Sequence, residues 1–91
     1  MENRRRAIVR IANQKGLHAR ASAKIVEAAA RFQSRITISR DGQSVDARSI
    51  MGLMMLAASL GAEIAIEAEG PDSDAALAAI VALAQAKFGE D

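Results

Sequence analysis

The chain has 91 residues, and one histidine, two phenylalanines and no cysteine, tryptophan or tyrosine are among them. A chain of this length supplies apolar side chains for one core, so we expect a single domain over residues 1–91. Twelve basic and eleven acidic residues give a formal net charge of +1, which predicts no bulk attraction to nucleic acid or to an anionic membrane.

The residues that are absent exclude several kinds of site. Without cysteine there are no disulfides and no thiolate metal sites, and one histidine alone does not make a zinc site. We therefore expect no metal and no cofactor. The N-terminal residues are basic and run directly into a strand-like segment, with no apolar signal core and no stretch that could span a bilayer. The expected location is the cytoplasm.

The first half of the chain reads as a strand, a helix and a hairpin. Residues 7–12 carry β-branched side chains, with Val9 and Ile11 on one face of the expected strand, and a polar turn follows at 13–16. Over residues 19–32 the apolar side chains recur with helical spacing, in the stripe Ile25, Ala29 and Phe32. Two alternating runs at 35–40 and 43–48 are joined by Asp41-Gly42, a dipeptide typical of tight hairpins.

The second half adds a short helix, a strand and a longer helix. Ser49 is a good N-cap residue for the apolar run 50–60, and residues 63–69 alternate glutamate with apolar side chains. An acidic cap at 72–74 precedes an alanine-rich helix, whose expected buried stripe is Leu77, Val81, Ala84 and Phe88. The order βαββαβα predicts an α+β, two-layer open-faced sandwich with helices on one face of an antiparallel sheet.

His18 is the residue with the clearest chemical potential. It lies at or beside the predicted N-cap of the helix over 19–32, where the backbone N–H groups of Ala19 and Arg20 could hold an anion. A neutral imidazole is a competent nucleophile near pH 7, and the Arg20 guanidinium matches the oxygens of a phosphoryl group. No nucleotide-binding loop or Mg²⁺-binding carboxylate cluster accompanies them. A partner must therefore supply the donor or the acceptor.

A structural role for His18 remains open on the residues alone. A lone histidine at this position can simply cap the helix or lie in an exposed loop. The arginine two residues further on makes the functional interpretation about as good as the structural one, and does not decide between them.

Two segments resemble a known family. GLHARAS, followed by an amphipathic helix, and RSIMGLMML, after a hairpin, are similar to the signature segments of the histidine phosphocarrier family (HPr) of the bacterial phosphotransferase system. The resemblance covers nearly the whole chain. It implies that enzyme I phosphorylates Nδ1 of His18, with phosphoenolpyruvate as the ultimate donor, that Arg20 steadies the phosphate, and that a IIA protein accepts it. The protein would be a stoichiometric carrier and no enzyme. It also implies the strand order 1-4-2-3 with three helices on one face.

The same resemblance assigns roles around Ser49. It implies that Ser49 is a regulatory serine, phosphorylated where an HPr kinase/phosphorylase exists. It also implies that partners dock on Leu17, Ile50, Met51 and Met54, and methionine side chains suit a surface that receives several partners.

The sequence departs from the family in one place. Ala21 and Ser22 stand where the family usually has proline and alanine, and alanine there leaves the first turn of a helix intact. The C-terminal segment resembles the nitrogen-related branch of the system, whereas RSIMGLMML resembles kinase-responsive forms. We therefore expect a regulatory relay more than bulk sugar uptake.

Two other functions compete with this one. A non-phosphorylated α+β regulatory module could bind partners through its methionine-rich surface, but it would not need His18. A nucleic-acid-binding domain could use the open sheet face, but Glu63, Glu67 and Glu69 on the last strand would repel phosphate backbones. We expect neither nucleic acid nor membrane among the partners.

Overall fold

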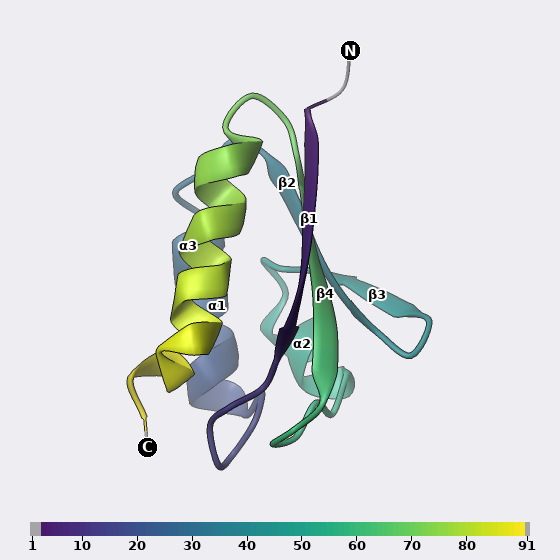
Figure 1. Cartoon of the computed structure of the whole chain (residues 1–91), viewed down its shortest axis with the longest axis vertical. Coiled ribbons are helices and arrows are strands. Elements are labelled where there is room, and N and C mark those ends of the chain that lie inside the picture. The colour runs from purple at the N-terminus through teal and green to yellow at the C-terminus, as the bar shows by residue number, and fades with distance from the viewer. Residues whose placement is uncertain (1–2, 91) are drawn as a thin grey trace.

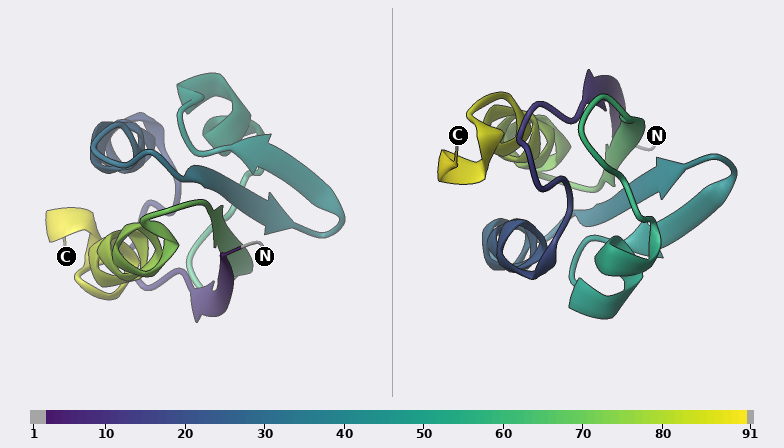
Figure 2. Two further views of the ribbon diagram at one scale, coloured as in Figure 1. Left: turned by 90° about the horizontal axis from the view of Figure 1, so that it is seen from above. Right: turned by 90° about the horizontal axis from the view of Figure 1, so that it is seen from below.

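The computed structural model describes residues 3–90 and has a four-stranded sheet with its helices on one face (Figures 1 and 2). The sheet order is β1-β4-β2-β3, and all three neighbouring pairs are antiparallel. The elements in chain order are β1 (Arg4–Arg10), α1 (Ala19–Ala29), β2 (Arg35–Arg40), β3 (Gln43–Asp46), α2 (Ile50–Met55), β4 (Glu63–Glu69), α3 (Ser73–Gln85) and a short 3₁₀ turn η1 (Lys87–Gly89). The predicted fold class and strand order are confirmed.

The core lies between the sheet and the helices and forms one cluster. The inward side chains of β4 are buried, whereas the glutamates that alternate with them face the open side of the sheet, as the period of two predicts. Helices α1 and α3 each contribute a buried stripe, and α2 contributes Leu53. The largest fully buried apolar side chains are Ile11, Ile25, Ile36, Ile38, Leu53, Ile64, Ile66, Ile80 and Phe88.

The first strand lies further toward the N-terminus than the sequence predicts. It covers Arg4–Arg10, whereas residues 7–12 were expected, and it pairs in continuous register with β4, from Arg4 opposite Glu69 to Arg10 opposite Glu63. Opposite charges across the two strands favour the register that local β-propensity did not reveal.

Two predicted elements end earlier in the structure. Helix α1 stops at Ala29, short of Phe32, and Arg48 donates to the backbone carbonyls of Ala29 (3.1 Å) and Phe32 (2.7 Å). The hairpin's second strand stops at Asp46, whose carboxylate accepts from the backbone N–H of Arg48 at 2.7 Å. Arg48 therefore leaves the strand and caps the C-terminus of α1.

The buried stripe of α3 is rotated from its predicted position. Ala76, Ile80 and Ala84 are fully buried, whereas Leu77 and Val81 are only partly buried. In a helix so rich in alanine, side-chain size does not identify the core face. Phe88 is buried as expected, but it belongs to η1, where its φ is +54°.

Candidate functional site

His18 is the N-cap residue of α1, and both its ring nitrogens are hydrogen-bonded. Nδ1 accepts from the backbone N–H of Arg20 at 3.2 Å, and Nε2 lies 2.7 Å from Oε2 of Glu90. The imidazole keeps 26% of its surface exposed. The ring is thus held by two hydrogen bonds while part of its surface stays in contact with solvent.

The loop before His18 is held by a close backbone contact. Gly16 has φ +64°, and a Cβ there would lie 2.3 Å from the carbonyl oxygen of Ala58. The same oxygen accepts from the backbone N–H of Leu17 at 2.9 Å. Only glycine fits this approach, so Gly16 fixes the path of the chain into the N-cap.

Leu17 corrects one sequence-based assignment. We expected its side chain on the docking surface, but only 4% of the residue is exposed, and it belongs to the core cluster. Its backbone N–H is bound to the Ala58 carbonyl, and its side chain packs in the core. Leu17 therefore anchors the loop before His18 in the core and offers almost no surface to a partner.

Glu90 was not predicted as a site residue, yet it contacts His18 directly. Its side chain is 17% exposed, and its Oε1 accepts from Nδ2 of Asn13 at 3.1 Å. Desolvation opposes its ionisation, but hydrogen bonds from Asn13 and His18 and the charge of Arg20 outweigh this and lower the pKa of the Glu90 carboxyl. Because Glu90 is far from His18 in sequence, no motif spacing could have indicated the contact.

Arg20 lies in the first turn of α1 and is exposed. It lines a hollow together with Gln14, Lys15, Gly89 and Glu90, the residue whose carboxylate contacts His18. Two cationic side chains and one carboxylate therefore line the hollow. The backbone N–H of Arg20, which we expected to be free for an anion, donates to His18 Nδ1 in this state.

Ala21 and Ser22 are both buried. Ser22 Oγ donates to the carbonyl of Leu17 at 3.3 Å, and its backbone N–H donates to the carbonyl of His18 at 2.9 Å. Helix α1 begins normally with these residues in place of the family's usual pair.

Ser49 caps α2 as predicted, since its Oγ accepts from the backbone N–H of Gly52 at 3.0 Å. The helix buries only Leu53 and leaves its other large side chains in solvent. The exposed fractions are 40% for Ile50, 70% for Met51, 41% for Met54 and 68% for Met55. We call these four residues the α2 patch; Met55 was not among the predicted interface residues.

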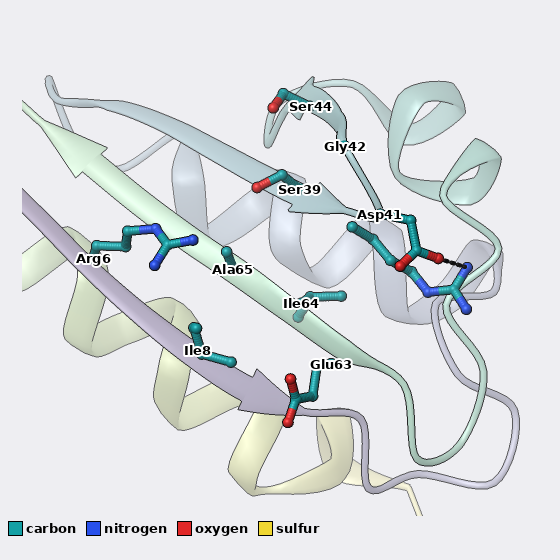
Figure 3. Close-up of a pocket in the computed structure, with 10 residues that line it drawn as sticks. Arg6, Ile8, Ser39, Asp41, Gly42, Ser44, Glu63, Ile64 and Ala65 are labelled. Atoms are coloured by element: carbon teal, nitrogen blue, oxygen red, sulfur yellow. Dashed lines mark ion pairs between the residues drawn. The ribbon is translucent and has the colours of Figure 1, made fainter.

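The open face of the sheet carries a second hollow. Figure 3 shows a polar hollow between the ends of β1, β4 and the β2–β3 hairpin, with Arg6, Ile8, Ser39 and Ala65 along it. It has no nucleophile with an activating partner. Among residues 3–90 no cluster of three or more histidine, cysteine or acidic side chains could hold a metal ion, and no helix is long and apolar enough to cross a membrane.

Comparison with known proteins identifies the family. The family described as "PTS HPr component phosphorylation site" matches residues 6–86. The chain belongs to the HPr family of the phosphotransferase system. It is 51% identical over 80 residues to the phosphocarrier protein HPr of Cupriavidus necator, covering 88% of this chain and 90% of that one.

Two further relatives extend the comparison. The phosphocarrier protein NPr of Shewanella violacea is 45% identical over 82 residues, covering 90% of each chain. The crystal structure of HPr-C-His from Thermoanaerobacter tengcongensis superposes with a TM-score of 0.91 at 41% identity, covering 96% of this chain and 98% of that one. The chain is thus an HPr phosphocarrier, and because relatives carry both names, the regulatory branch stays a prediction.

Proposed function

We propose that His18 accepts a phosphoryl group on Nδ1 from phosphorylated enzyme I, with phosphoenolpyruvate as the ultimate donor, and passes it to a IIA protein. The observation that carries this proposal is the hydrogen bond from the Arg20 N–H to Nδ1 at the N-terminus of α1. A ring nitrogen that accepts a hydrogen bond is unprotonated, so the Nδ1 lone pair can act as a nucleophile once the incoming phosphoryl group displaces the Arg20 N–H. We assign the exchange to the cytoplasm, as expected from the sequence.

Phosphoryl transfer to His18 requires a nucleophilic nitrogen and donors for the phosphoryl oxygens. As the Nδ1 lone pair forms the N–P bond, the bond from phosphorus to the donor breaks, and its electrons leave with the donor. The Arg20 N–H then loses its partner and can donate to a phosphoryl oxygen together with the Ala19 N–H. The exposed Arg20 side chain, which follows His18 by two residues and lines the same hollow as Glu90, can add charge-assisted hydrogen bonds. The protein is a stoichiometric carrier in this scheme.

The α2 patch is the surface we propose for docking enzyme I and IIA proteins. An exposed apolar helix face is a common mark of a protein interaction site, and flexible methionines can adapt to different partners. Ser49 starts the same helix. We propose it as the regulatory site for an HPr kinase/phosphorylase, because a phosphate there adds charge at the edge of the patch while remaining compatible with the helix N-terminus.

The alternative of a non-phosphorylated binding module is favoured by no specific observation. Incubation with purified enzyme I and phosphoenolpyruvate tests the proposal. We expect acid-labile phosphate on the wild type and none on His18→Ala. Equal labelling of the two proteins would refute the assignment of His18.

A further inference from the structure

We propose that Glu90 is a positioning residue, whose carboxylate keeps a proton on Nε2 of His18 while Nδ1 gains and loses the phosphoryl group. This inference rests on the proposed function of His18. It concerns a side chain that the sequence motifs do not include.

The C-terminal segment is anchored so that Glu90 reaches the imidazole. The side chain of Phe88 is fully buried in the core, although its backbone has φ +54°. Nζ of Lys24, on α1, donates to the carbonyl oxygen of Phe88. Two residues later the Glu90 carboxylate lies between Nδ2 of Asn13 and Nε2 of His18. A buried side chain and hydrogen bonds from two other segments therefore fix the carboxylate.

Asn13 is itself fixed. It is fully buried, and its Nδ2 also donates to the carbonyl oxygen of Gly16 at 2.9 Å. The loop that leads into His18 and the segment that follows α3 are thus tied through one amide group. The carboxylate and the imidazole are held to the same framework, and their 2.7 Å contact does not depend on a free tail.

Two independent contacts specify the same protonation pattern on the ring. An ionised carboxylate can only accept, so Nε2 must carry the hydrogen of the bond to Glu90. The N–H of Arg20 can only donate, so Nδ1 must be unprotonated. The neutral imidazole with its proton on Nε2 satisfies both partners, and it presents Nδ1 as the nucleophile.

The proton does not have to move during transfer. When the Nδ1 lone pair forms the N–P bond, the ring acquires positive charge, which the adjacent carboxylate stabilises across the Nε2–H bond. In the onward step the electrons of the N–P bond return to Nδ1 and the phosphoryl group leaves for the acceptor. The carboxylate meets the opposite ring nitrogen from the phosphoryl group, an arrangement like that of the aspartate behind the catalytic histidine of serine proteases.

Glu90→Gln and Glu90→Ala test this role, with Glu69→Gln as a control that removes the same charge at the far end of β4, beside Arg4. The donor is phosphoramidate, which is too small to depend on partner docking. It reacts in its N-protonated form, so its P–N bond breaks as the bond to Nδ1 forms, and neutral ammonia leaves with the electron pair. We expect about tenfold slower phosphorylation of both Glu90 variants, a difference of about 1.4 kcal/mol in activation free energy, and no change for Glu69→Gln.

The position of the ring proton supplies a readout that a merely structural role would not change. In ¹⁵N NMR at a pH where His18 is neutral, we expect a protonated Nε2 and an unprotonated Nδ1 in the wild type. In Glu90→Ala the two ¹⁵N shifts should move toward each other as the tautomers exchange. Unchanged shifts and unchanged rates would overturn the role of Glu90. Absence of phosphorylation in the wild type would instead refute the proposed function of His18.

Discussion

Gly16 provides a sharp test of how the loop before His18 is built, because the chain offers a matched control in Gly42. Both residues have positive φ, +64° and +83° respectively. A Cβ at Gly16 would lie 2.3 Å from the Ala58 carbonyl oxygen and 2.8 Å from Cα of Ser59, whereas a Cβ at Gly42 meets nothing within 4 Å. The difference between the two alanine variants therefore isolates the steric contact.

The expected loss of folding free energy in each variant follows from these contacts. An alanine in the left-handed region costs about 1–2 kcal/mol at either site. At Gly16 the loop must also move away from Ala58, which weakens the Leu17 hydrogen bond to the same oxygen. The lost hydrogen bond adds about 1 kcal/mol and the displaced packing about 1–3 kcal/mol. We expect Gly16→Ala to lower the free energy of unfolding by at least about 2 kcal/mol more than Gly42→Ala.

Urea unfolding at 25 °C measures this difference. The chain has no tryptophan or tyrosine, so far-ultraviolet circular dichroism is the appropriate signal. In thermal melts the Tm of Gly16→Ala should lie at least about 8 °C below that of Gly42→Ala. Equal destabilisation of the two variants would show that the close approach to Ala58 has no energetic consequence.

Three further predictions concern the site and its surroundings. Arg20→Ala should slow phosphoryl transfer about tenfold with little change in Tm. Arg31→Ala makes the same substitution at an exposed position after the same helix and should leave the rate unchanged. Equal rates for the two variants would remove Arg20 from the site. Ser49→Asp should weaken enzyme I binding in titrations at fixed ionic strength, because a hydrated charge then lies beside the α2 patch. The control Ser44→Asp should bind enzyme I with wild-type affinity. Unchanged affinity for Ser49→Asp would make Ser49 a plain helix cap. Hydrogen bonds from the Ser34 side chain, and then from the Gln33 and Ser34 backbones, lower the pKa of Asp72 below 3.8. Its carboxylate therefore stabilises the fold above that pH and loses the effect as pH falls through the folded-state value. Asp72→Asn should be less stable than wild type at pH 7, and a stability difference that does not close in acid would contradict this.

The sequence predicted those features that depend on local patterns. The cap positions of His18 and Ser49 follow from residues next to each helix, and the hairpin follows from Asp41-Gly42. The strand order came from the resemblance to a family and not from pairing rules, since the alternation in each strand does not specify its neighbour.

The features that were missed depend on contacts between distant segments. Glu90 contacts His18 only because Phe88 anchors the segment after α3 in the core. Leu17 was assigned to the docking surface by the family resemblance, but its side chain belongs to the core cluster. Neither arrangement has a local sequence signal.

The central claim is that Nδ1 of His18 is the atom that carries the phosphoryl group. The direct measurement is ³¹P and ¹⁵N NMR of ¹⁵N-labelled protein after reaction with enzyme I and phosphoenolpyruvate. We predict one phosphohistidine signal with phosphorus coupled to Nδ1, and an Nε2 that keeps its proton against Glu90. Phosphorus coupled to Nε2, or phosphate on any other residue, would contradict the account.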